Sequence, residues 1–202
     1  MLALLLLFLG VSILSLQDST VKLIAPQTSF WQVQVVRSAF NLVMVCGLAV
    51  LAGGLGLLWP LRFWPAAARA VLLALCMGFF FGAAQQVSVT QMATGLYTYP
   101  LFVTLLAGPL LGERIGVWRL GALALGAVGC GFVLNPFADA FTIYQVVPVF
   151  AGFFYACNIL VLRRYCSRES PLALAFVVNL VFIVTGSCLL YTSDAADDSA
   201  CV

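Results

Sequence analysis

The feature that most constrains this chain is a series of long apolar runs separated by short polar connections. About 20 apolar residues, rising 1.5 Å each in an α-helix, cross the roughly 30 Å hydrocarbon core of a membrane. Seven such runs follow one another, at Met1–Leu16, Val35–Leu58, Ala66–Val87, Ala93–Leu111, Val117–Leu134, Thr142–Leu162 and Pro171–Leu190. We therefore predict an all-α fold, a multi-pass transmembrane helical bundle.

The composition also indicates that the chain lies in lipid. Of the 202 residues, 64% are hydrophobic and only 8% are charged, and the mean hydropathy is +1.13. A soluble domain carries about 25% charged residues, so lipid and not water must surround most of this chain. Because the connections are short, we expect one compact bundle and not a string of domains.

Several classes of chemistry are excluded by residues that the chain lacks. There is no histidine, which removes histidine-ligated metals and histidine bases. Before residue 191 the acids are Asp18, Glu113, Asp139 and Glu169, all in or near loops, which argues against an intramembrane aspartyl protease. The seven cysteines show no metal-type spacing, and no glycine-rich phosphate loop occurs. We expect a solute-binding protein that is not an enzyme, with no cofactor, metal or nucleic-acid partner.

The basic residues predict an orientation in the membrane. Seven of the nine Lys and Arg residues fall at three alternate connections, and these seven are Arg62, Arg69, Arg114, Arg119, Arg163, Arg164 and Arg168. Alternate connections share one side of a membrane, and basic loops are retained in the cytoplasm. We expect a cytoplasmic N-terminus.

Polar side chains inside the apolar runs predict a binding cavity. Such groups are costly in lipid and usually face a bundle interior or a water-filled space. The residues that we expect to face one central cavity and bind the substrate are Arg37, Asn41, Gln86, Thr94, Tyr97, Tyr155 and Asn158. The guanidinium would attract an anionic group, and the amides and hydroxyls would bond a polar solute. An alternative stays open, in which these residues only cross-link helices by hydrogen bonds.

Prolines and glycines distinguish two of the runs. Pro100 and Pro109 cannot donate to the carbonyls four residues earlier, so each permits a bend in the fourth run, suited to gating or to a static kink. The fifth run has no strongly polar residue between Leu120 and Leu134 and, like the second, is rich in glycine. We predict close helix contacts at these glycines. We also predict that the fifth run is a peripheral packing helix, which offers a homodimer contact.

A weak internal repeat suggests a transporter plan. A shift of 142 residues superimposes Phe8 on Phe150, Gly10 on Gly152, Lys22 on Arg164 and Phe40 on Phe182. Because five helices separate the two copies, the copies would be inverted in the membrane. Inverted repeats around a central site are a recurring transporter architecture.

The segment "TGLYTYPLFVTLLAGPLLGERIGVWRLGALALGAVGCGFVL", Thr94 to Leu134, resembles helices 4 and 5 of the EamA family in the drug/metabolite transporter superfamily. The "PLF" step, the "LLGER" exit and the glycine-rich helix carry the match, and "FWQVQVVRSAF" resembles the arginine-bearing start of the family's helix 2. The resemblance covers about Met1 to Leu190. It implies ten helices in two inverted five-helix repeats, with helices 5 and 10 peripheral and the others lining the cavity.

This resemblance divides the chain into three parts. Residues 1–134 form the first five-helix repeat, and residues 142–190 form the first two helices of the second repeat. Residues 191–202 form a polar tail whose sequence, "YTSDAADDSACV", resembles read-through adapter sequence. We therefore expect a truncated fragment with seven of ten helices. The resemblance implies that its parent lies in the inner membrane and transports small polar metabolites, amino-acid-like or drug-like, by alternating access. The alternative is a seven-helix membrane sensor or scaffold without transport activity.

Overall fold

The computed structural model describes residues 30–83, 86–112, 116–134 and 142–199. Within these ranges the secondary structure is entirely helical. The α-helices are α2 (Phe30–Ala52), α3 (Phe63–Gly82), α4 (Val89–Leu96), α5 (Tyr99–Leu111), α6 (Val117–Leu134), α7 (Val147–Tyr165) and α8 (Pro171–Ser199), and two 3-10 turns are η1 (Leu55–Leu58) and η2 (Ile143–Gln145).

The described residues contain six segments that are long and apolar enough to cross a membrane. Five are single helices, and the sixth, Val89–Leu111, combines α4 and α5. The predicted all-α, multi-pass bundle is therefore confirmed. The run expected at Met1–Leu16 lies outside the described residues.

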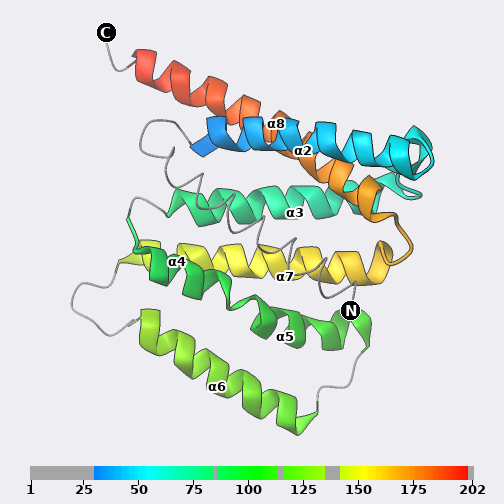
Figure 1. Cartoon of the computed structure of the whole chain (residues 1–202). Helices are drawn as coiled ribbons and strands as arrows, with labels where there is room; N and C mark the ends of the chain where they lie inside the picture. The colour runs from blue at the N-terminus through cyan, green and yellow to red at the C-terminus, as the bar shows by residue number, and fades with distance from the viewer. Residues whose placement is uncertain (1–29, 84–85, 113–115, 135–141, 200–202) are drawn as a thin grey trace.

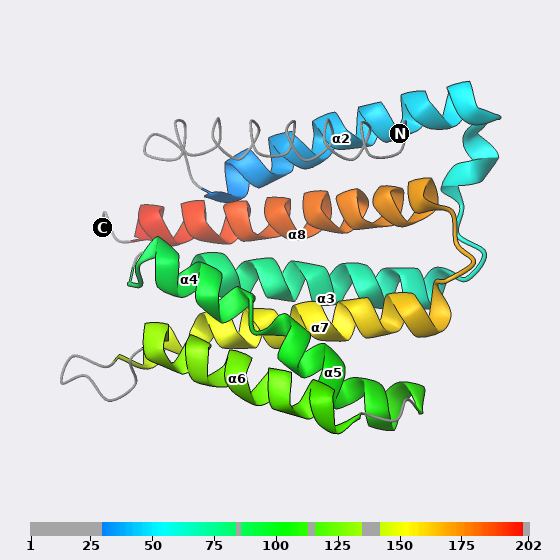
Figure 2. The same cartoon turned by 60° about the horizontal axis from the view of Figure 1, so that its bottom comes forward.

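Helix α7 occupies the middle of the bundle. It packs against α3 on one side and against α4 and α5 on the other, and α8 packs against both α2 and α3. Figures 1 and 2 show the resulting order, with α2 and α8 at one edge and α5 and α6 at the opposite edge. The helix that lies deepest is thus one that the sequence assigns to the second repeat.

Helix α2 ends six residues before the predicted end at Leu58. Gly53 and Gly54 have φ angles of 141° and 115°, which L side chains rarely adopt, and the chain turns there into η1. The sequence reading treated these glycines as sites of helix contact. The structure uses them to stop the helix, because two successive residues of positive φ cannot continue an α-helix.

The fourth predicted run is broken and not simply bent. Ser88 and Gln91 form a reciprocal capping box at the start of α4, and α4 ends at Leu96. The Thr98 hydroxyl donates to the Gly95 carbonyl at 2.6 Å, inside the break. Pro100 lies in the first turn of α5, where a missing N–H costs nothing. The predicted interruption is confirmed, but it lies at Tyr97–Thr98, and Pro100 begins a new helix there.

Small residues set the closest helix contacts, although not the glycines expected from the sequence. A Cβ built on Gly95 would lie 2.5 Å from the Cβ of Pro148, and one built on Gly152 would lie 2.8 Å from the Gly95 carbonyl oxygen. At Gly186 a Cβ would lie 2.7 Å from a methyl carbon of Val35. These glycines join α4 to α7 and α2 to α8. By contrast, a Cβ at Gly129 in α6 would meet no described atom within 4 Å.

Helix α6 lies at the edge of the bundle, as predicted for a packing helix (Figure 2). None of its residues is buried within the chain, and Trp118 is 94% exposed. Its inner side faces α4 and α5. The homodimer contact expected on this helix stays a prediction.

Candidate functional site

The seven predicted site residues lie on four different elements. Arg37 and Asn41 are on α2, Gln86 follows α3, Thr94 and Tyr97 belong to α4 and the break after it, and Tyr155 and Asn158 are on α7. In Figure 1, α3 and α7 separate α2 from α4 and α5. The described residues therefore do not form the single central cavity expected from the sequence, and a cavity shared with further helices stays a prediction.

The polar face of α2 is directed toward α8. Ser38 is fully buried, and Gln34 is 8% exposed and donates to the Ser38 hydroxyl at 3.5 Å. Arg37 and Asn41 are partly buried on the same helix. Because α2 packs on α8 and η1, these two residues belong to the α2–α8 edge and not to the neighbourhood of Tyr155.

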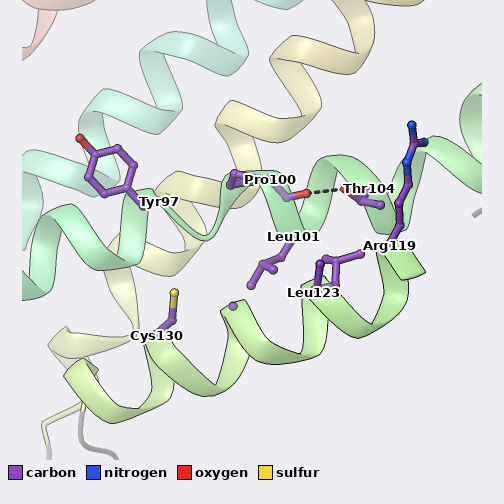
Figure 3. Close-up of a pocket in the computed structure, with 9 residues that line it drawn as sticks. Tyr97, Pro100, Leu101, Thr104, Arg119, Leu123 and Cys130 are labelled. Carbon is purple, nitrogen blue, oxygen red and sulfur yellow. Dashed lines mark hydrogen bonds between the residues drawn. The ribbon is translucent and has the colours of Figure 1, made fainter. Parts of the chain in front are cut away.

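Tyr97 lines a recess between α5 and α6, which Figure 3 shows in close-up. The recess has a volume of about 430 Å³ and runs from Tyr97 at one end to Arg119 at the other. Its wall is mostly apolar, and the Thr104 hydroxyl is turned to the Pro100 carbonyl at 2.8 Å. With Tyr97 66% exposed and α6 unburied, this is an open recess at the edge of the bundle.

Two further predicted residues make only local contacts or none. The Thr94 hydroxyl donates to the Thr90 carbonyl at 2.8 Å, one turn back on its own helix. Gln86 is exposed in the turn after α3, where its backbone N–H donates to Ala83. For Thr94 the local bond supports the simpler alternative, in which a polar residue satisfies itself within the bundle.

The remaining two, Tyr155 and Asn158, lie in the most deeply packed part of the molecule. Positions 155, 158 and 162 of α7 are spaced by three and four and share a face. Leu162 on this face packs against a buried cluster that includes Ala66 and Ala70 of α3. Asn158 is 3% exposed, so its amide is enclosed within the bundle.

Arg69 of α3 extends into the same interface. It lies between Ala66 and Ala70, and its guanidinium acts electrostatically on the Tyr155 hydroxyl and the Cys166 thiol. The sequence reading assigned Arg69 to a loop, which is wrong. Helix α3 begins at Phe63, so Arg69 lies on its second turn, inside the span Phe63–Gly82.

Two atoms of this cluster are buried without a hydrogen-bond partner. Among the described residues, neither the Arg69 Nε nor the Asn158 Oδ1 is bonded. One is a donor and the other an acceptor. Leaving such a group unpaired costs about 1–3 kcal/mol, so each of these two atoms calls for water or a ligand as its partner.

Aromatic rings flank the polar cluster. The Tyr155 ring meets the Tyr99 ring of α5 edge to face, with centroids 4.9 Å apart. Further along α7, Phe154 stacks on Phe79 of α3 at 5.3 Å, and Phe153 meets Phe102 of α5 at 5.5 Å. The central helix therefore presents hydrogen-bonding groups beside several flat apolar faces.

The sequence contained signals that Arg69 lies inside a span, because the run predicted from Ala66 already includes it, although it was counted with the basic connections. Proline is favoured in the first turn of a helix, and Pro65 follows Phe63 and Trp64. Starting the helix near Pro65 moves the arginine from the first turn of the predicted run to the second turn of the helix. Tyr99 had no comparable signal, because its role depends on α5 packing beside α7.

The known proteins that this chain resembles in sequence are transporters. No protein-family model and no solved structure matches the chain. It is 35% identical over 102 residues to a riboflavin transporter of Vibrio cholerae serotype O1, covering 50% of this chain and 34% of that protein. A riboflavin transporter of Rhizobium johnstonii is 29% identical over 108 residues, covering 54% of this chain and 36% of that protein. An uncharacterized transporter of Archaeoglobus fulgidus is 31% identical over 107 residues, covering 53% and 39%. The match thus spans between about a third and two fifths of the length of these relatives.

Proposed function

We propose that this chain is part of an inner-membrane transporter of the EamA type whose substrate is a flat, polar heteroaromatic metabolite of the riboflavin class. The observation that carries the proposal is the buried, unpartnered donor and acceptor of Arg69 and Asn158 beside the Tyr155–Tyr99 pair. Two of the relatives described above are named riboflavin transporters. The resemblance of Thr94–Leu134 to the EamA family supports the same class.

The chemistry of the cluster fits such a substrate. An isoalloxazine ring has a planar apolar face and an edge of alternating carbonyl and N–H groups. A guanidinium donates to carbonyl oxygens and an asparagine Oδ1 accepts from an N–H, while tyrosine rings pack against a flat ring. This narrows the amino-acid-like or drug-like range expected from the sequence. Among the residues predicted there, Tyr155 and Asn158 are retained in the proposed site.

The proposal places the cluster within a larger assembly of helices. Helices α2 and α8, which the internal repeat pairs with each other, lie against one another, as related halves of an inverted repeat would. In the ten-helix protein, further helices would complete the cavity around α7, and alternating access would open it to either side. The cytoplasmic N-terminus and a subunit contact through α6 belong to the same proposal.

Riboflavin uptake by the full-length protein tests the substrate class. The protein would be expressed in a riboflavin auxotroph without its own uptake system, and the entry of radiolabelled riboflavin measured beside an empty-vector strain. Saturable uptake that unlabelled riboflavin competes is the expected result. Normal membrane abundance with no uptake or efflux of riboflavin would refute the substrate class and favour the sensor or scaffold.

Asn158→Leu tests the site. The change removes an acceptor that has no partner among the described residues, so stability should hold or rise while substrate binding weakens. We expect riboflavin affinity to fall about tenfold, as for the loss of one hydrogen bond near the upper end of its usual worth.

Asn179→Leu is the matched control, because Asn179 is also buried but its Nδ2 already donates to Ala175 on its own helix at 2.8 Å. Transport is expected to survive in this control. Equal losses in the two variants, or a loss explained wholly by abundance, would point to helix packing and against the site.

A further inference from the structure

The basic end of the bundle is held together by one carboxylate. Glu169, in the connection between α7 and α8, accepts hydrogen bonds from the backbone N–H groups of Leu61 at 2.7 Å and Arg62 at 2.9 Å. Both carboxylate oxygens are used in this way. The α2–α3 and α7–α8 connections are therefore fastened to each other, as their expected location on one side of the membrane requires.

A second contact ties α5 to the same end. The Arg164 guanidinium donates through Nη1 to the carbonyl of Leu110 and lies 5.5 Å from the Tyr165 ring centroid. Leu110 is in the last turn of α5, where carbonyls have no partner within the helix. A cation at a helix C-terminus is also favoured by the helix dipole.

These contacts enclose a recess of about 310 Å³ that is rich in positive charge. Its lining includes Arg62, Arg164, Arg168 and Ser167, with Glu169 as the one acid among its lining residues. The guanidinium groups of Arg62 and Arg168 form no hydrogen bond or ion pair with any other described residue. The Glu169 carboxylate is held by backbone donors and offsets one of the three guanidinium charges, so the lining keeps a net positive charge beside the Ser167 hydroxyl.

The ends of the spans place the recess near one boundary of the apolar segments, where lipid headgroups would lie. It is bounded by residues at the ends of three membrane spans, Phe63–Gly82, Val147–Tyr165 and Pro171–Tyr191. At the same end of the bundle the rings of Trp59, Trp64 and Trp118 are exposed, between 73% and 94%. Exposed tryptophans of this kind mark the membrane–water interface.

We propose that this recess binds the phosphate of an anionic phospholipid headgroup, of the phosphatidylglycerol or cardiolipin class. Arginine forks bind phosphate oxygens in pairs of hydrogen bonds, and basic pockets between helices at the cytoplasmic interface suit such lipids. The lipid is favoured over free phosphate because the recess opens among span ends and interfacial aromatic rings. Its occupant would brace the α2–α3 and α7–α8 connections and the end of α7. This site is separate from the cluster on α7 and does not depend on the transport proposal.

Native mass spectrometry of the purified 202-residue chain, released from nanodiscs of mixed phosphatidylglycerol and phosphatidylcholine, tests this. We expect one retained phosphatidylglycerol in preference to phosphatidylcholine. The double variant Arg62→Gln/Arg168→Gln should weaken the retention about tenfold or more. Arg164 is left intact because it also caps α5.

The matched control is Arg119→Gln/Arg163→Gln, which removes two exposed charges near the same end but outside the recess. Retention in this control should stay within about twofold of the unmodified chain, since general attraction near the membrane surface is screened by salt. Equal losses in both double variants, or no preference for the anionic lipid, would overturn the proposal. Displacement of the lipid by millimolar inorganic phosphate would assign the site to free phosphate instead.

Discussion

Replacing Gly95 by alanine tests whether the close approach of α4 to α7 holds the bundle together. The added Cβ would lie 2.5 Å from the Cβ and 2.9 Å from the carbonyl carbon of Pro148. Non-bonded carbons meet at about 3.5–4.0 Å, so the helices must separate locally by roughly 1 Å. The obstacle is a proline ring and its backbone, buried at the start of α7, which cannot rotate away.

Overpacking of this kind costs about 1–3 kcal/mol. Alanine also favours a helix over glycine by up to about 1 kcal/mol, which would hide part of the cost. Gly78→Ala is the matched control, because Gly78 lies in α3 and a Cβ there meets nothing within 4 Å. We expect Gly95→Ala to be about 1–3 kcal/mol less stable than Gly78→Ala.

Unfolding of the purified chain by SDS in mixed micelles, followed by tryptophan fluorescence, measures the difference. A second variant sharpens the test, since a Cβ on Gly152 would lie 2.8 Å from the Gly95 carbonyl oxygen. Once one alanine has separated the helices, the other should cost less, with a coupling of about 0.5 kcal/mol or more. Equal stability of Gly95→Ala and Gly78→Ala, or strict additivity in the double variant, would show that the contact is not as tight as the structure has it.

Three further predictions concern the basic end. Glu169→Ala should lower stability by about 1–2 kcal/mol through the loss of two backbone hydrogen bonds to a charged group, and Glu169→Gln should lower it less; no change in the same SDS assay would contradict the proposed fastening. Burial raises the pKa of the Cys166 thiol, against the opposing effect of Arg69. Because the thiolate is the reactive form, alkylation of Cys166 in an otherwise cysteine-free chain should be slow at pH 7 and should accelerate at a higher pH than alkylation of an exposed Ser167→Cys control. Identical pH profiles for the two cysteines would refute this. A membrane-impermeant maleimide should label Ser167→Cys and Gln86→Cys from opposite sides of the membrane, and labelling of both from outside would reject the topology.

The arrangement of basic residues shows how far sequence reasoning reached. Counting runs and arginines predicted that three connections share one side. The hydrogen bonds that Glu169 accepts from the backbone N–H groups of Leu61 and Arg62 place two of them at the same end of the bundle. The Arg164 contact with Leu110 brings the end of α5 to the same place. This inference succeeded because the number of membrane crossings between two connections alone decides whether they lie on the same side.

The candidate site was only partly predictable. Tyr155 and Asn158 were identified as polar groups in an apolar run, which the cost of burying such groups makes visible in sequence. Whether a polar atom finds a partner is a different question. The Thr94 hydroxyl is a donor and bonds a carbonyl of its own helix, whereas the Asn158 Oδ1 is an acceptor, to which a helix interior offers no free N–H. Only the packing of other helices decides whether that oxygen finds a donor.

The amino-acid sequence by itself determined the helical class, the six described spans, the interruption near Pro100 and the peripheral place of α6. Each follows from hydropathy, backbone chemistry or the absence of polar groups, which act within one segment. Only the tertiary structure decided that α7 is central, that Arg69 is enclosed beside it, and that Gly95 and Gly152 carry the close contacts while the glycines of α6 do not. These depend on which faces of distant segments meet, and in a membrane that choice is made by packing and hydrogen bonding between helices, because lipid gives no hydrophobic preference for one apolar face over another.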